Sequence, residues 1–145
     1  ENVAGIAGFG AAAAAARRDL NEQQRIALLR DRLEREAIEI APEAQVIGRE
    51  ATRLPNTTCL ALAGASAETL VIRFDLAGVA VSAGSACSSG KVGASTVLAA
   101  MGLPDDLARS AIRVSLGWTT TERDIEAFLA AWSAIAGGQQ HRAVA

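Results

Sequence analysis

The sequence AIRVSLGWTTTERDIEAFLAAWSAIAGG, residues 111–138, decides the fold, because a strand signal and a helix signal follow one another directly in it. Residues 111–116 alternate in polarity, as expected of a strand with one buried face. The apolar positions of this predicted strand are Ile112, Val114 and Leu116. Arg113 and Ser115 occupy the opposite face. The alternation therefore predicts a sheet that is apolar on one side only.

The second half of the stretch predicts an amphipathic helix that ends at Gly137-Gly138, followed by a loose tail at residues 139–145. Thr121 and Asp124 form a variant of the capping box, in which side chains bind the free backbone N–H groups at a helix start. The apolar stripe of the helix consists of Ile125, Phe128, Leu129, Trp132, Ile135 and Ala136. A half-buried strand followed by such a helix predicts helices packed on a sheet.

Upstream of this stretch, further helix and strand signals follow one another. Residues 3–40 predict a long helix, with an alanine run and then apolar residues at three- and four-residue spacing. Short strands are predicted at residues 45–48, 57–63 and 79–82, and shorter helices at residues 66–78 and 95–101. The predicted fold class is α+β: a long N-terminal helix and a small antiparallel or mixed sheet covered by helices.

Composition narrows the class of protein. The chain has 145 residues, the size of one domain, and half of them are hydrophobic. Its 14 basic and 16 acidic side chains are interspersed, which gives no electrostatic reason to expect nucleic acid or an anionic membrane as partner. No apolar run is long enough to span a membrane, and two cysteines are too few for a disulfide framework. We therefore expect a cytoplasmic protein.

Cys87 is the first candidate for chemistry. It lies in a run of small and polar residues, 84–91, directly after a predicted strand. A reactive thiol needs access and nearby positive charge, and Lys91 is the neighbouring cation. The alternative is an ordinary buried cysteine, since free cysteine is among the most buried residue types. We interpret Cys59 as a core residue, because its predicted strand offers no polar group that would activate the thiol.

Arg113 is the second candidate. An arginine in the middle of a strand either points to solvent or binds an anion, and its planar guanidinium suits a carboxylate. The spacing leaves both possibilities open. His141, the single histidine, falls in the predicted tail and is a poor candidate for a general base.

The residues around both candidates resemble one family. Residues 81–91, VSAGSACSSGK, are similar to the active-site cysteine loop of the NifS/IscS-type cysteine desulfurases, and Ser85-Ala86-Cys87 belongs to its most specific part. Residues 111–117 resemble that family's Ile-Arg-Phe-Ser-Leu segment. Residues 54–57, LPNT, and residues 1–8, ENVAGIAG, also match, in the family's order. The resemblance covers nearly the whole chain.

The resemblance implies the C-terminal small domain of a fold-type-I, pyridoxal-phosphate-dependent transferase. Such an enzyme converts L-cysteine to L-alanine and leaves a persulfide on the catalytic cysteine, here Cys87. Arg113 matches the arginine that binds the substrate carboxylate. A homodimer, and a sulfur acceptor such as an iron-sulfur scaffold protein or a thiolation pathway, are implied as partners.

The same resemblance implies an incomplete enzyme. The chain begins without an initiator Met, and the family's cofactor lysine, stacking histidine and most phosphate ligands lie before the matched segment. We expect residues 1–16 to end the large cofactor domain, residues 17–138 to form the small domain, and the isolated chain to be inactive. The alternatives are a selenocysteine lyase or another class-V aminotransferase and, if the 145 residues are the native protein, a non-enzymatic sulfur carrier.

Overall fold

The computed structural model describes residues 1–83 and 95–143 as an α+β fold, with side chains described as far as residue 138. Helix α1 (Val3–Arg18) is followed by a 3₁₀ turn (Asp19–Asn21) and helix α2 (Glu22–Ile40). Strands β1 (Ala44–Val46) and β2 (Thr57–Leu62) come next, then helix α3 (Ala67–Leu76) and strand β3 (Ser82–Ala83). The described chain ends with helices α4 (Thr96–Ala100) and α5 (Asp105–Ser110), strand β4 (Ala111–Ser115) and helix α6 (Glu122–Ala143).

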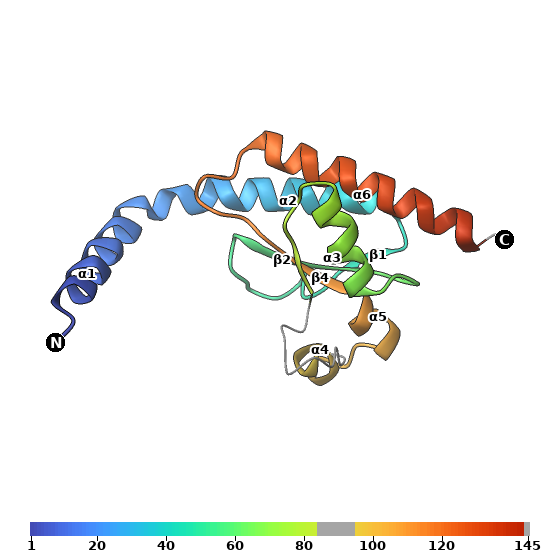
Figure 1. Cartoon of the computed structure of the whole chain (residues 1–145), viewed down its shortest axis with the longest axis horizontal. Helices are drawn as coiled ribbons and strands as arrows, with labels where there is room; N and C mark the ends of the chain where they lie inside the picture. Colours follow the sequence, from blue (N-terminus) through green and yellow to red (C-terminus); the bar gives the residue numbers. More distant parts are fainter. Residues whose placement is uncertain (84–94, 144–145) are drawn as a thin grey trace.

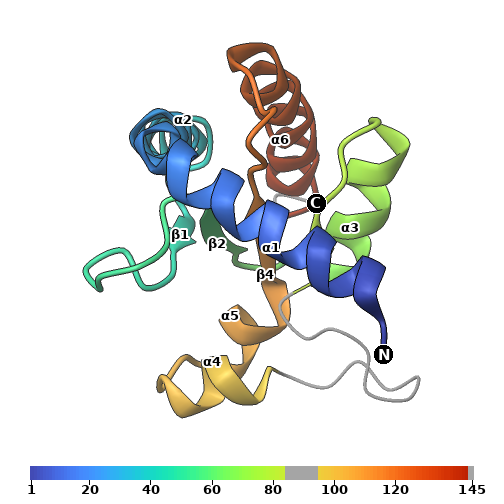
Figure 2. The same ribbon diagram turned by 90° about the vertical axis from the view of Figure 1, so that its left-hand side faces the viewer.

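The four strands form one antiparallel sheet in the order β1-β2-β4-β3. Helices α2, α3 and α6 cover one face of this sheet, while α4 and α5 lie against the other face (Figure 1). Figure 2 shows the same layers from the end of the molecule, with α1 leaving the helical layer at an angle. The predicted α+β class is confirmed.

The core lies between the sheet and helices α2, α3 and α6. Phe74, Phe128 and Trp132 stack in its centre, with the rings of Phe74 and Phe128 4.9 Å apart. The indole Nε1 of Trp132 donates a hydrogen bond of 2.9 Å to the carbonyl of Ala37, which joins α6 to α2. The alternation predicted for residues 111–116 is confirmed, because Ile112, Val114 and Leu116 are buried and Arg113 and Ser115 are exposed.

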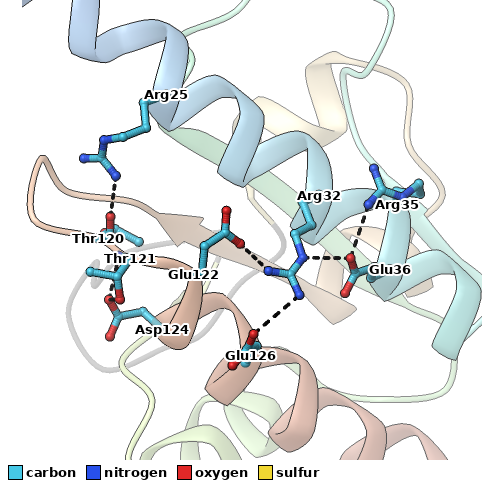
Figure 3. Close-up of polar contacts among 9 residues, drawn as sticks. All are labelled: Arg25, Arg32, Arg35, Glu36, Thr120, Thr121, Glu122, Asp124 and Glu126. Carbon is cyan, nitrogen blue, oxygen red and sulfur yellow. Dashed lines mark hydrogen bonds and ion pairs between the residues drawn. The ribbon is translucent and has the colours of Figure 1, made fainter.

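Polar side chains align α2 with α6 along their solvent side (Figure 3). Arg32 on α2 pairs with Glu36 on its own helix and with Glu122 and Glu126 on α6. The carboxylate of Asp124 accepts hydrogen bonds from the backbone N–H and the hydroxyl of Thr121, which lower the pKa of that carboxyl. The predicted capping interaction at the start of α6 is therefore confirmed.

Three predicted boundaries were wrong. The helix expected over residues 3–40 is interrupted at Asp19–Asn21, where Asp and Asn are weak helix formers. The strand expected at residues 79–82 is reduced to Ser82–Ala83, because the N–H of Val79 closes α3 by donating to the carbonyl of Phe74. Helix α6 continues past Gly137-Gly138 to Ala143.

The guanidinium of Arg73 packs against α6 at residue 138. It donates hydrogen bonds to the carbonyls of Ala134 and Ile135, and a Cβ atom at residue 138 would lie 3.0 Å from one of its nitrogens. A larger residue at this position would therefore require a small shift of Arg73. Among the helices that the structure describes, none is both long and apolar enough to cross a lipid bilayer.

Candidate functional site

The candidate site lies on the face of the sheet that is opposite helices α2, α3 and α6. Arg113 on β4 is the register partner of Cys59 on β2 and of Ser82 on β3. Residues directly opposite one another in antiparallel strands point to the same face, so the three side chains form one row across the sheet. This face is covered only in part, by the cluster around Leu98 and Ala108 of α4 and α5.

A pocket of about 530 Å³ opens beside this row. The loop between β1 and β2 forms one wall, and α4 forms the other. Its described lining consists of Ile47, Gly48, Ala51, Arg53, Leu54, Thr57, Thr58, Cys59, Ser95, Val97, Leu98, Met101 and Arg113. The lining is mainly apolar and includes two arginines, Arg53 and Arg113, a combination suited to a ligand with an apolar body and an anionic end.

Both ends of the segment that contains Cys87 lie at this site. Ser82, at the upstream end, is the register partner of Arg113. Ser95, at the downstream end, caps α4 by accepting the N–H of Leu98, and it lines the pocket. Cys87 and Lys91 themselves lie outside the described residues, and so does the side chain of His141. The predicted roles of Cys87 and Arg113 stay predictions.

The guanidinium of Arg113 is exposed at the pocket. Within the part of the chain that the structure describes, no carboxylate forms an ion pair with it. It can therefore accept an external anion without first breaking such a pair. Arg113 is exposed and also lines a pocket, and its binding of an anion stays a prediction.

Cys59 differs from its predicted place in the core. It is half-buried on the outer face of the sheet, where it packs against the cluster of Leu98 and Ala108. Burial raises the pKa of its thiol, and the positive charge of Arg113 opposes that shift. Because the thiol of Cys59 is neutral, it does not form an ion pair with the guanidinium of Arg113. A carboxylate at the same place would form one and would compete with an external anion.

A buried ion pair at the edge of the pocket was not predicted from the sequence. Glu34 on α2 binds Arg53 in the β1–β2 loop through two hydrogen bonds of 2.6 and 2.8 Å. The position of Glu34 was the available signal, because it follows Leu33 and precedes Ala37 by three residues on the buried stripe of its helix. A charged residue on such a stripe predicts a partner of opposite charge.

The described residues do not provide a cofactor or metal site. They contain no lysine, since the single lysine of the chain is Lys91, and they contain no cluster of metal-binding side chains. A pyridoxal phosphate group is held in proteins by a lysine Schiff base together with phosphate ligands. The chemistry of these residues fits anion binding and does not fit the binding of that cofactor.

The family model and the curated relatives that match this chain point to the same family. Residues 1–128 match the family described as aminotransferase class-V. The chain is 43% identical over 129 residues to a cysteine desulfurase of Cereibacter sphaeroides, covering 89% of this chain and 33% of that protein. It is 38% identical over 127 residues to the cysteine desulfurase NifS of Azotobacter vinelandii, covering 87% and 32%.

A solved structure supports the same relationship. The NifS-like protein from Rickettsia africae ESF-5 superimposes with a TM-score of 0.79 at 38% identity, over 93% of this chain and 35% of that one. The predicted likeness to NifS-like proteins, with the α+β fold of that part of a fold-type-I transferase, is therefore confirmed. The chain spans about a third of the length of the curated relatives that it matches. With residues 1–128 matched, the chain belongs to the class-V aminotransferase family.

Proposed function

We propose that the full-length protein is a cysteine desulfurase, in which this chain supplies the sulfur-accepting thiol and the carboxylate ligand. The observation that carries the proposal is the place of Arg113, which lines a pocket beside Ser82, the residue that leads into the segment containing Cys87. The names of the relatives support the same reaction. The proposed overall reaction is balanced: L-cysteine and the Cys87 thiol give L-alanine and a persulfide on Cys87.

Arg113 would bind the α-carboxylate of L-cysteine. A guanidinium donates two parallel hydrogen bonds to a carboxylate, which fixes both the position and the orientation of a small amino acid. The extended backbone of β4, paired on both sides, holds the Cα of Arg113 in place. Arg113 would therefore position the substrate, while Cys87 would accept its sulfur.

Pyridoxal phosphate would be held by the part of the full-length protein beyond this chain, because the described residues lack a lysine for it. When bound, that cofactor supplies an electron sink for reactions at amino-acid substrates. The isolated 145 residues are accordingly proposed to be inactive. A homodimer, a cytoplasmic location and an iron-sulfur or thiolation acceptor stay predictions from the resemblance.

The test uses the full-length protein loaded with pyridoxal phosphate and supplied with L-cysteine. We expect alanine and, by peptide mass spectrometry, a mass increase of about 32 Da on Cys87, the mass of one sulfur atom; dithiothreitol added afterwards should reduce this persulfide and release the sulfur as sulfide. Cys87→Ser should abolish the adduct and the release of sulfide. Cys59→Ser is the matched control and should keep both.

Two results would contradict the proposal. Full alanine release by Cys87→Ser would favour an aminotransferase or lyase that needs no thiol. A persulfide formed on Cys87 of the isolated 145 residues by a persulfide donor, with no turnover by the loaded full-length protein, would favour a sulfur carrier.

A further inference from the structure

The pocket beside β4 is lined by two arginines whose surroundings differ. Arg53 forms a bidentate pair with Glu34, with Nη1–Oε1 and Nη2–Oε2 distances of 2.6 and 2.8 Å. Arg113 has no ion-pair partner in the described ranges. Of the two arginines that line the pocket, Arg53 thus has its guanidinium bound to an internal carboxylate, whereas Arg113 has no such partner among the described residues.

The pair is anchored from the buried side. The side chain of Glu34 is 4% exposed and that of Arg53 is 20% exposed, and among the described residues Glu34 is the only charged one that is fully buried. Burial favours the neutral carboxyl, but the hydrogen bonds and charge of Arg53, together with contributions from Thr58 and Arg30, outweigh it, and the pKa of Glu34 is lowered. Glu34 is thus ionised at neutral pH and holds Arg53 at the pocket wall.

Neighbouring groups leave Glu34 as the main partner of Arg53. The guanidinium of Arg30 lies 3.9 Å from Glu34 and donates a hydrogen bond of 2.9 Å to the carbonyl of Leu54. Asp31 also contributes charge near Arg53, but its Oδ1 accepts two hydrogen bonds from Arg30. The two arginines of this cluster together fix the loop between β1 and β2, which has no regular structure of its own after Val46.

We propose that Glu34 is a positioning residue that withholds Arg53 from the pocket, so that a carboxylate ligand is bound by Arg113 alone. Both guanidiniums could bind a carboxylate in the same bidentate way, and a pocket with two such groups would hold a small amino acid in two places. Occupying Arg53 with an internal carboxylate removes the competing position. This inference rests on the proposed role of Arg113.

The test measures binding of a simple carboxylate, trifluoropropionate, to the full-length protein by fluorine NMR. In the otherwise unaltered protein, we expect Arg113→Gln to weaken binding by about tenfold, the effect of losing one charge-assisted bidentate contact. In a Glu34→Gln background, Arg53 is released into the pocket. Arg113→Gln should then weaken binding by less than about twofold, and adding Arg53→Gln should remove the remaining binding.

Controls separate this effect from general disturbance of the fold. Glu50→Gln removes an exposed carboxylate from the same loop and should leave the full effect of Arg113→Gln intact. Glu34→Met fills the buried position with an apolar side chain of similar volume and should release Arg53 as Glu34→Gln does. It serves as the second variant if Glu34→Gln does not fold.

The outcomes distinguish the two proposals. If Arg113→Gln alone does not weaken carboxylate binding, the proposed role of Arg113 fails and this inference fails with it. If Arg113→Gln weakens binding equally with and without Glu34, the role of Arg113 stands and Glu34 does not withhold Arg53. The inference is supported if the Glu34 variants still bind the carboxylate after Arg113→Gln. This binding must be absent when Glu34 is present, and it must be lost when Arg53 is also replaced.

Discussion

Ser82 and Arg113 are register partners, with β3 ending one residue after Ser82. Because opposite residues of an antiparallel pair share a face, the chain enters the segment that contains Cys87 from a point beside the guanidinium. Residues far apart in the sequence thus meet at one place on the sheet.

Replacing Arg113 should weaken substrate binding more than it alters the fold. We expect Arg113→Gln in the full-length protein to raise KM for L-cysteine by about tenfold or more, because a bidentate carboxylate contact is lost. Arg113→Lys should recover only part of this, since an ammonium lacks the planar pair of donors. Steady-state kinetics would measure KM, and equal thermal unfolding midpoints of the variants and the unaltered protein would show that the fold is intact. Arg109 is an exposed arginine on α5, and Arg109→Gln is the matched control.

The thiol of Cys59 should report the charge of Arg113. Burial raises the pKa of this thiol and Arg113 lowers it, so Arg113→Gln should move the alkylation midpoint of Cys59 to higher pH. Alkylation by iodoacetamide across pH, followed by peptide mass spectrometry, measures the midpoint. Arg109→Gln should leave the midpoint in place. A midpoint unchanged by Arg113→Gln would mean that the guanidinium does not act on the sulfur.

The Glu34–Arg53 pair should respond asymmetrically to substitution. Arg53→Gln leaves the buried carboxylate of Glu34 with only the more distant Arg30 as ion-pair partner and should lower the free energy of unfolding at pH 7 by about 3 kcal/mol. Glu34→Gln leaves the more exposed Arg53, which can turn to water, and should cost about 1–2 kcal/mol. Urea denaturation of both variants would check the order of these costs.

The unaltered protein and Arg53→Gln should differ in how the ionisation of Glu34 makes their free energy of unfolding depend on pH. The pKa of Glu34 is lowered in the folded protein, so its stabilising contribution is present above its unfolded pKa and is lost as pH falls through the folded value. In Arg53→Gln, burial without that partner raises the pKa, so this variant should gain stability relative to the unaltered protein as pH falls from 7 to about 5. An identical loss on acidification in both proteins would show that the pair does not control the ionisation of Glu34.

Trp132 should be the most sensitive position in the core. It is fully buried between Phe74 and Phe128, so Trp132→Ala should lower the free energy of unfolding by about 3–5 kcal/mol. Trp132→Phe should cost only about 1–2 kcal/mol, because the carbonyl of Ala37 still accepts the N–H of Ala41. The exposed Trp118 is the control, and its change to Ala should stay within about 0.5 kcal/mol in urea denaturation.

Helix α1 should promote self-association of the isolated chain. None of its residues is buried, and Val3, Ile6 and Phe9 are exposed apolar side chains at three-residue spacing. The later turns of α1 help to line a hollow of about 620 Å³. Ile6→Glu combined with Phe9→Ser should reduce association in sedimentation velocity. Leu76→Ser, at an exposed apolar position on α3, should not. A monomer at high concentration for the unaltered chain would contradict the prediction.

Local patterns determined the elements of this protein. The alternation in residues 111–116 fixed which side of β4 is buried, and the capping residue Thr121 fixed the start of α6. These features depend on neighbouring side chains and backbone groups, so the sequence suffices to predict them. The end of α6 was missed because glycines commonly follow the last turn of a helix, whereas here the helix continues through Gly137 and Gly138 to Ala143.

Only the tertiary structure decided how the site is assembled. Pairing between β2, β4 and β3 brought Cys59, Arg113 and Ser82 into one row, and the fold placed Arg53 against Glu34. No local pattern encodes these contacts, because strand order and the burial of a charge depend on how distant segments pack. The sequence by itself determined the residues available for chemistry, and the packing of the sheet determined which of them share a pocket.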